Sequence, residues 1–235
     1  MSDSKNDPIG RAIRDFLANT HDENIIVKSS LCEDDVIPVV YLFRSEQNLP
    51  ELEKIALTLC KGKILDVGGG AGVHARILSS QNKSIEIIDT SEGAIEYHKE
   101  LGLKSRVLDF FDLKNEYFDT LLFLMNGLGI AKKLQNLPNF LIHCYDLLNL
   151  GGTVIADSTD INYLYEDEDG GYWVDLNNAY YGNFDFQMCY KDICGEPFDW
   201  LYVDFDTLKK EAEKIGFSVE KIFEEENQYL VKLTK

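Results

Sequence analysis

The chain has 235 residues, of which 45% are hydrophobic, which suits one large α/β domain or a domain with a small cap. Acidic residues outnumber basic ones by 41 to 23, and the net charge of −18 argues against a nucleic acid partner, since an acidic surface repels phosphates. The first residues lack an apolar signal core, and no apolar run is long enough to cross a bilayer. Five cysteines without a Cys-x-x-Cys pair disfavour a disulfide framework or a metal site, so we expect a reduced, cytoplasmic protein.

Residues 1–62 are predicted to form an N-terminal extension or cap. Apolar residues at helical spacing predict a helix over 8–17, and Pro50 favours the start of another, because proline suits a first helical turn. Two intervening segments, 24–28 and 36–43, are apolar and look extended. The extension is therefore expected to be mainly helical.

The stretch from Lys63 to Ile77 organises the rest of the chain. A short apolar run that carries Asp66 leads into a glycine loop, after which apolar residues recur at helical spacing. This pattern predicts a buried strand, a tight turn and a helix, the first unit of a doubly wound α/β sheet. A dinucleotide-binding fingerprint starting at Gly68 would require glycine or alanine at position 73, where this chain has valine.

The pattern Asp66-x-Gly68-x-Gly70-x-Gly72 resembles motif I of the class I S-adenosylmethionine (SAM) dependent methyltransferases. Glycine lets a ligand lie against the backbone, and the free N–H groups of the next helix suit the carboxylate of the methionine half. The resemblance implies that Asp66 receives the ammonium group and that the cofactor lies on Gly68, Gly69, Gly70 and Gly72. The alternative is an ordinary turn that needs positive φ.

A second buried strand over 84–88 ends at Asp89, 17 residues beyond Gly72. This is close to the offset of roughly 20 residues at which an acid binds a ribose in nucleotide folds. We expect Asp89, with its neighbour Thr90, to contact the SAM ribose. The alternative is a helix cap before Ser91, because aspartate and serine both cap helices.

A third strand over 105–108 is followed by Asp109 and Phe110. In the methyltransferase family an acid at this place meets the adenine amino group and an apolar neighbour covers the ring. The resemblance therefore assigns Asp109 and Phe110 to the adenine, with Asp112 as the rival acid.

The fourth strand, 118–125, ends at Met125 and Asn126. At the topological switch point the ends of the first and fourth strands face each other, so this loop should border the reacting methyl group. It resembles motif IV of the family, but it lacks the Asn/Asp-Pro-Pro-aromatic sequence of amino-directed DNA methyltransferases. The difference argues against methylation of a nucleic acid base.

The implied reaction is in-line displacement at an activated methyl group, for which the protein mainly supplies proximity and alignment. An oxygen or nitrogen acceptor would also need a proton acceptor, which the sequence does not identify. Asn126 is the residue expected nearest to the methyl group, and Asp157 ends the fifth strand, 153–157. Tyr41 is a further candidate, because extensions in this family often lie over the active-site mouth. Two weaker candidates are His74 and Tyr181.

Between about 166 and 205 the chain leaves the repeating βα pattern. Strict alternation over 182–191, a turn at 194–197 and a second alternating run over 198–205 predict an inserted β-hairpin rich in aromatic residues. This insert could cover the acceptor, form a homodimer surface or complete the core. After it, a helix and a final strand pair are expected to close the sheet.

Together these patterns predict an α/β fold with a doubly wound, mostly parallel seven-stranded sheet, its methyltransferase domain spanning 63–235. The predicted function is transfer of a methyl group from SAM to an oxygen or nitrogen of a small molecule, with S-adenosylhomocysteine as the second product. A nicotinamide-dependent oxidoreductase and a non-catalytic SAM-binding protein are the alternatives.

Overall fold

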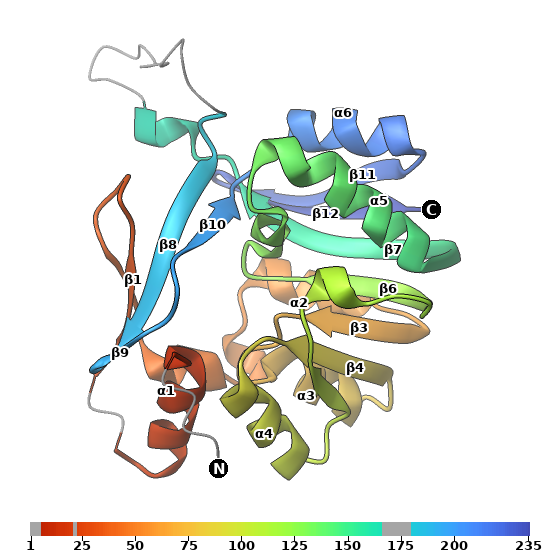
Figure 1. Cartoon of the computed structure of the whole chain (residues 1–235). Helices are drawn as coiled ribbons and strands as arrows, with labels where there is room; N and C mark the ends of the chain where they lie inside the picture. Colours follow the sequence, from red (N-terminus) through yellow and green to blue (C-terminus); the bar gives the residue numbers. More distant parts are fainter. Residues whose placement is uncertain (1–5, 21–22, 166–179) are drawn as a thin grey trace.

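Seven strands form the larger of two sheets in the computed structural model, which describes residues 6–20, 23–165 and 180–235. In chain order they are β3 (Lys63–Val67), β4 (Ser84–Asp89), β5 (Ser105–Val107), β6 (Phe118–Phe123), β7 (Leu148–Thr159), β11 (Ser218–Glu225) and β12 (Gln228–Thr234). Across the sheet their order is β11-β12-β7-β6-β3-β4-β5 (Figure 1). The five strands from β3 to β7 pair in parallel, and β12 runs antiparallel to both of its neighbours. The predicted seven-stranded, mostly parallel α/β fold is confirmed.

Helices cover both faces of this sheet. The six α-helices are α1 (Pro8–Leu17), α2 (Glu51–Leu59), α3 (Val73–Ser80), α4 (Glu92–Glu100), α5 (Leu137–Leu147) and α6 (Phe205–Ile215). Successive side chains of a strand point to opposite faces, so in β3 Ile64 packs with α2 and α3, whereas Leu65 packs with α5 and α6. None of these described helices is long and apolar enough to cross a membrane.

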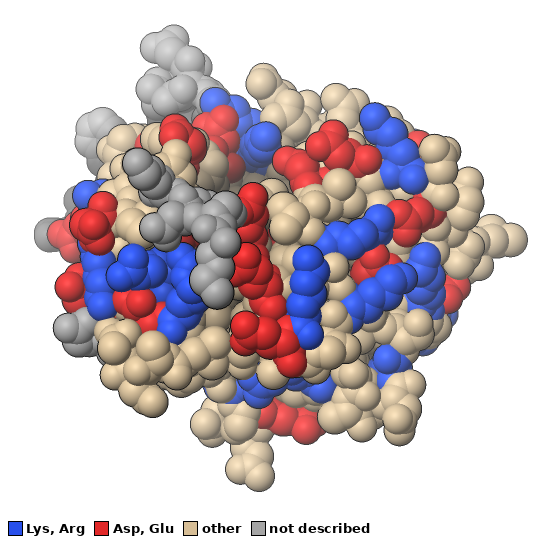
Figure 2. All heavy atoms as spheres, turned by 60° about the horizontal axis from the view of Figure 1, so that its bottom comes forward, with Lys and Arg blue, Asp and Glu red and all other residues tan. Residues whose placement is uncertain are grey.

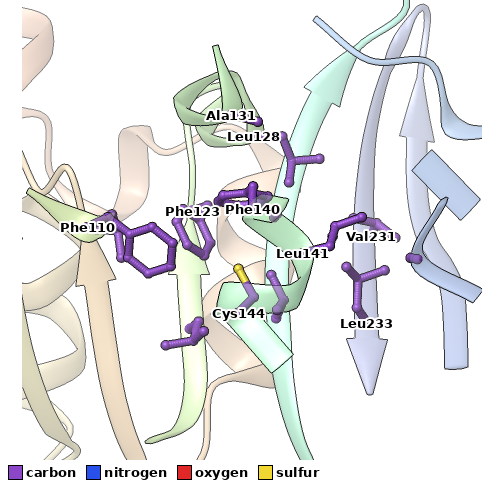
Figure 3. Close-up of a cluster of buried hydrophobic side chains, with 14 of the residues drawn as sticks. Phe110, Phe123, Leu128, Ala131, Phe140, Leu141, Cys144, Val231 and Leu233 are labelled. Carbon is purple, nitrogen blue, oxygen red and sulfur yellow. The ribbon is translucent and has the colours of Figure 1, made fainter. Parts of the chain in front are cut away.

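Aromatic rings fill the part of the core between β6 and α5. Phe110, Phe123 and Phe140 are at most 1% exposed, and the Phe110 and Phe123 ring centroids lie 5.1 Å apart in an edge-to-face arrangement. Figure 3 shows these rings together, with the cluster continued by Leu141, Cys144, Val231 and Leu233. This core fixes the parallel strands, and therefore the loops at their carboxyl ends.

The first helix is joined to α4 through one carboxylate. Asp7 accepts hydrogen bonds from the Gly10 N–H, which caps α1, and from the Gly93 N–H and the Ser91 hydroxyl at the start of α4. A Cβ atom on Gly10 would lie 2.7 Å from the Gly93 Cα, so the two helices can approach this closely only with glycine. The extension is thereby fastened to the helix layer of the parallel sheet.

A second sheet joins the N-terminal extension to the inserted hairpin. Its strands are β1 (Ile25–Lys28), β2 (Asp35–Ile37), β8 (Asn183–Tyr190), β9 (Ile193–Cys194) and β10 (Phe198–Leu201). Their order is β10-β8-β1-β2, with β9 also paired to β8, and this sheet stands beside the parallel one (Figure 1). The hairpin prediction is confirmed, but the extension contributes two strands as well as helices. The first part of the predicted insert, residues 166–179, lies outside the described residues.

The predicted extended segment 36–43 is wrong in its second half. Strand β2 ends at Ile37, because Pro38 has no N–H to donate to the ladder, and Val39–Phe43 forms a 3-10 helix. The alternating run over 198–205 also ends early, at Leu201.

The expectation that no disulfide forms is wrong. Cys189 and Cys194 are bonded, because they are directly opposite each other in the β8–β9 ladder. Of the free cysteines, Cys60 and Cys144 are buried and Cys32 is exposed. The Cys-x-x-Cys test missed the pair because strand register, rather than sequence spacing, brings the two sulfurs together.

Candidate functional site

The glycine loop between β3 and α3 forms an open cradle. Gly68, Gly70 and Gly72 all have positive φ, between +52° and +74°, which other residues rarely adopt. A Cβ atom on Gly68 or Gly70 would meet nothing within 4 Å, so the backbone there faces open space. On the inner side a Cβ on Gly69 would lie 2.4 Å from a methyl carbon of Ile87. The loop therefore needs glycine for its shape and presents bare backbone to a ligand.

Beneath this cradle lies Asp66, at the end of β3. Its side chain is 2% exposed, and Oδ2 has no hydrogen-bond partner within the described parts of the chain. Burial, with the nearby charge of Asp89, raises the pKa of Asp66 to about 6, although His74 acts in the opposite direction. A buried carboxylate oxygen without a partner, beside a cradle of bare backbone, suits a cationic group such as an ammonium.

The strand-end acid predicted for the ribose holds the cradle in place. Asp89 accepts hydrogen bonds from the Gly70 N–H at 2.9 Å and from the Ser91 N–H at 2.8 Å. Each carboxylate oxygen can accept another bond, so this anchoring leaves room for hydroxyl donors. Thr90, the next residue, is exposed. Both the expected ligand contact and the alternative structural role are compatible with this geometry.

Histidine 98 supports the same loop from below and was missed in the sequence. Its side chain is fully buried, and Nε2 donates to the Gly70 carbonyl at 2.9 Å. Burial lowers the pKa of His98, so the ring is neutral at pH 7. His98 lies 28 positions after Gly70, and no sequence motif indicates a supporting residue at that distance.

The two residues predicted for the adenine lie in different environments. Asp109 is exposed and accepts a hydrogen bond from the Phe111 N–H, whereas Phe110 is 1% exposed and packs among the core rings. The neighbouring Phe111 is only half-buried and stacks on His143. The ring beside Asp109 that keeps an accessible face is thus Phe111. The rival acid, Asp112, is exposed.

The loop after β6 is strained and held by a buried acid. Met125 and Asn126 have φ values of 64° and 57°, and two consecutive left-handed residues without glycine are unusual. Asp157, at the end of β7, is 1% exposed, and its two oxygens accept from the Asn126 N–H at 3.0 Å and from Gln228 at 2.8 Å. The Asn126 amide oxygen also accepts from the Thr159 hydroxyl at 2.7 Å. Asp157 therefore fixes the loop, and its proton-accepting oxygens are already occupied.

Burial also raises the pKa of Asp157 to about 6, although hydrogen bonds from Asn126, Gln228 and Gly127 oppose this. A group with this pKa is partly protonated near neutrality. At 1% exposure, however, it is closed off from any molecule in solution.

A buried ionic network connects the extension to the glycine loop. Arg44 donates to both oxygens of Glu53 at 2.7 and 2.6 Å, and the Nε2 of His74 lies 2.6 Å from the same carboxylate. Burial alone would raise the pKa of Glu53, but the hydrogen bonds and charges of His74 and Arg44 hold it below its usual value. The Arg44 guanidinium also lies over the Tyr41 ring, 4.2 Å from its centroid. Through this network Tyr41, which is 38% exposed, is linked to α2 and α3.

The second sheet, which contains the inserted hairpin, packs against the loop after β6. The indole of Trp200 on β10 lies so close to Gly129 that a Cβ there would be 2.1 Å from its ring. The Asn183 side chain accepts from the Leu134 N–H at 2.8 Å, a second contact between the same regions. The hydroxyl of Tyr181 donates to Asp160, just past the end of β7. Aromatic residues of the insert thus border the carboxyl ends of β6 and β7.

A search of solved structures finds a SAM-dependent methyltransferase from Bacteroides fragilis in complex with S-adenosyl-L-homocysteine. The two sequences are 43% identical over 98% of this chain and 95% of the other, and the TM-score is 0.91. The chain belongs to the class I SAM-dependent methyltransferases. SAM is therefore the methyl donor of this methyltransferase.

Two more distant structures share the fold of the methyltransferase. CcbJ from Streptomyces caelestis is 15% identical over 79% of this chain and 89% of its own, with a TM-score of 0.60. The sugar N-methyltransferase KedS8 from Streptoalloteichus sp. ATCC 53650 is 12% identical over 88% and 97%, with a TM-score of 0.57. No protein-family model and no curated protein matches the sequence.

The residues around the cradle fit this methyl donor. Open backbone at Gly68 and Gly70 leaves room for the methionine half, and the unpaired oxygen of Asp66 suits its ammonium group. When bound, SAM supplies a methyl group on a positively charged sulfur, which needs no further activation. The work left to the protein is to bind, to orient and to exclude water.

Proposed function

We propose that this methyltransferase transfers its methyl group to an oxygen or nitrogen atom of a small molecule. The contact of Trp200 with Gly129 is the observation that supports the proposal. It brings the aromatic side chains of the second sheet beside the loop that we expect to border the methyl group. Aromatic side chains beside this loop offer apolar surface that suits a compact ligand better than a polymer.

We further propose which residues hold SAM. Asp66 binds the ammonium group, the cradle of Gly68, Gly69, Gly70 and Gly72 supports the methionine half, and Asp89 with Thr90 binds the ribose. Asp109 meets the adenine, with Phe111 taking the ring contact first assigned to the buried Phe110. Met125 and Asn126 border the methyl group. In this assignment the methyltransferase domain is 63–235, and residues 1–62 with the insert form its acceptor side.

Surface charge supports an acceptor other than nucleic acid. The net charge is −18, and on the face that Figure 2 shows, lysine and arginine side chains are interleaved with aspartate and glutamate. Helix α4 is one acidic part of the surface, with three exposed glutamates, Glu92, Glu96 and Glu100. Phosphate backbones bind to continuous basic surfaces, which this pattern does not provide there.

The fold neighbour KedS8 is named a sugar N-methyltransferase. At 12% identity it demonstrates only that a chain of this fold can serve a small acceptor. The two earlier alternatives receive less support. A nicotinamide cofactor disagrees with family membership, and a non-catalytic binder disagrees with the close similarity to a methyltransferase.

Homodimer formation through the insert and a cytoplasmic location stay predictions. Both long edges of β8 are paired within the chain, so a dimer would have to use β10 or β2 at the sheet edges. Light scattering on the purified protein would determine the state. The Cys189–Cys194 disulfide is at odds with a reduced compartment, where such bonds are rare.

The proposal is tested in two steps. Calorimetry should detect binding of SAM and S-adenosylhomocysteine but not of NAD, and a ligand specific for the folded state should raise the melting temperature. Metabolite fractions are then incubated with SAM carrying a labelled methyl group. Label in a low-molecular-weight product supports the proposal, whereas label only in protein or nucleic acid contradicts it.

A further inference from the structure

The end of β7 carries a second acid that sequence reasoning did not single out. Asp160 follows Thr159, whose hydroxyl holds the Asn126 side chain at 2.7 Å, so it lies beside the loop expected to border the methyl group. Its backbone N–H donates to the Asn227 carbonyl at 2.8 Å, which fixes the residue at the edge of the sheet. Its position relative to the reacting methyl group is therefore set by the backbone of β7.

The two oxygens of Asp160 differ. Oδ1 accepts from the Tyr181 hydroxyl at 2.8 Å and from the Asn162 N–H at 3.1 Å, whereas Oδ2 has no hydrogen-bond or ion-pair partner among the described residues. The residue is half-buried. In contrast, Asp157 is 1% exposed and both its oxygens accept hydrogen bonds. Asp160 is thus the acid at this sheet end with an available oxygen.

The groups that influence the tyrosine hydroxyls here are negative or neutral. Burial and the charges of Asp160 and Asp204 raise the pKa of Tyr181, although a hydrogen bond from Tyr180 opposes this. Burial, with Asp35, Cys32, Tyr163 and Asp157, raises the pKa of Tyr202 to about 12. Both phenols therefore stay protonated and neutral at pH 7.

Basic residues are scarce in this part of the chain. Between Lys133 and Lys209 the sequence contains a single lysine, Lys191, and no arginine. Lys191 forms an ion pair with Asp15 on α1 at 2.8 Å. An anionic acceptor would therefore find no positively charged partner in this stretch, whereas a cationic acceptor could pair with the carboxylate of Asp160.

Aromatic faces surround the same place. The Tyr181 ring lies 4.5 Å from the Tyr180 centroid and 6.2 Å from that of Tyr165. The ring of Tyr202 packs edge-on against Phe184, and its hydroxyl has no partner in the described part of the chain. Aromatic faces next to a carboxylate attract ammonium groups, and an unpaired phenol offers a further polar contact.

We propose that Asp160 is an acceptor-binding residue and that the acceptor is an amine, bound first as its ammonium form. Tyr181 is a positioning residue, which holds Oδ1 so that Oδ2 faces the ligand. This inference rests on the proposed function and specifies its substrate class.

The chemistry balances. The bound ammonium gives one proton to the Asp160 carboxylate, which passes it to water, and the nitrogen recovers its lone pair. The nitrogen then forms a bond to the donor methyl carbon, while the electron pair of the breaking C–S bond stays on sulfur. The positive charge moves from sulfur to nitrogen, and S-adenosylhomocysteine leaves as a neutral thioether.

The test measures binding rather than turnover. The protein, saturated with S-adenosylhomocysteine, is titrated in a calorimeter with benzylammonium and with benzyl alcohol, a neutral molecule of similar size. The amine should bind more tightly by on the order of tenfold, because one favourable charge contact contributes about that factor. Asp160→Asn should remove the preference without altering the affinity for S-adenosylhomocysteine.

Two further variants separate charge from structure. Tyr181→Phe leaves the Asp160 charge in place, so it should weaken the preference only in part. Asp199→Asn is the matched control, because it removes an acid of the insert that pairs with Lys133 at 3.2 Å, and it should keep the full preference.

The outcomes distinguish the two proposals. Equal affinity for amine and alcohol, no binding of either, or an unchanged preference in Asp160→Asn overturns the amine proposal while the SAM site stands. Labelled methyl found only in protein or nucleic acid in the transfer assay would instead overturn the proposed function, and the amine inference with it.

Discussion

The two sheets of this methyltransferase are built in different ways. In the parallel sheet the strands β3 to β7 follow one another along the chain. Three of them, β4, β5 and β7, each pair with the strand that precedes them, and β6 pairs with β3, the first of the five. In the second sheet β1 pairs with β8, across more than half of the chain. In the assignment proposed above, the first sheet carries the cofactor cradle and the second one covers the acceptor side. On that proposal, local patterns form the cofactor site, whereas contacts between distant segments form the acceptor site.

The largest effect is expected from a truncation in the core of the parallel sheet. Phe140→Ala removes a fully buried ring that contacts Phe110 and Phe123, so unfolding free energy should fall by about 3–5 kcal/mol in urea denaturation. Ile25→Ala, at a fully buried position of β1, is the comparison. In the Ile25→Ala variant, the amide hydrogen exchange rates should increase only in β1, β2 and β8. Equal acceleration in β3 and β6 would mean that the two sheets unfold as one unit.

The next largest effect concerns the cradle. Asp89→Ala removes the acceptor of the Gly70 and Ser91 N–H groups as well as the proposed ribose contact, so affinity for S-adenosylhomocysteine should fall on the order of a hundredfold. Calorimetry measures the change, and circular dichroism checks the fold. Glu100→Ala, which removes an exposed acid at the end of α4, should leave the affinity unchanged. An unaltered affinity in Asp89→Ala would remove Asp89 from the site.

A third variant tests how the sheets are joined. Gly129→Val places side-chain atoms where the Trp200 indole lies, so it should destabilise the protein by about 1–3 kcal/mol. Combining it with Trp200→Ala should cost less than the sum of the single changes, because the collision is then absent. Additive losses in this double-mutant cycle would show that the indole does not pack on Gly129.

The smallest effect depends on pH. In the folded protein the pKa of Asp66 is about 6 against an ordinary 3.8, so the folded state binds more protons than the unfolded chain between these values. The contribution of Asp66 to stability therefore falls as pH rises through this window. Asp66→Asn cannot ionise and should be more stable than the original protein by about 1–3 kcal/mol at pH 7. Denaturation at pH 4 should show no such gain, and a gain that is equal at both pH values would contradict the shifted pKa.

Sequence reasoning located most of the cradle because its signals are local. The order Asp66, Gly68, Gly70, Gly72 implies a strand, positive φ and a helix within a few residues, and backbone sterics enforce that conformation wherever the chain lies. The same holds for Asp89, which a strand end and a following cap residue identify. These features do not depend on a partner from elsewhere in the chain.

Tertiary packing decided the features that sequence reasoning missed. Arg44 is only 7% exposed, because Glu53 neutralises its charge, and no local pattern indicates that pairing. Phe110 and Phe111 are equivalent in sequence, but only the geometry of the turn after β5 determines which of them enters the core.

Composition and hydrophobic periodicity by themselves indicated the fold class, and the glycine loop indicated the family through its resemblance to motif I. The disulfide between Cys189 and Cys194 and the different burial and hydrogen bonding of Asp157 and Asp160 were decided by tertiary structure alone. The physical reason is that register and burial arise from pairing between segments that are distant in sequence, and no local pattern encodes which oxygen of which acid remains free.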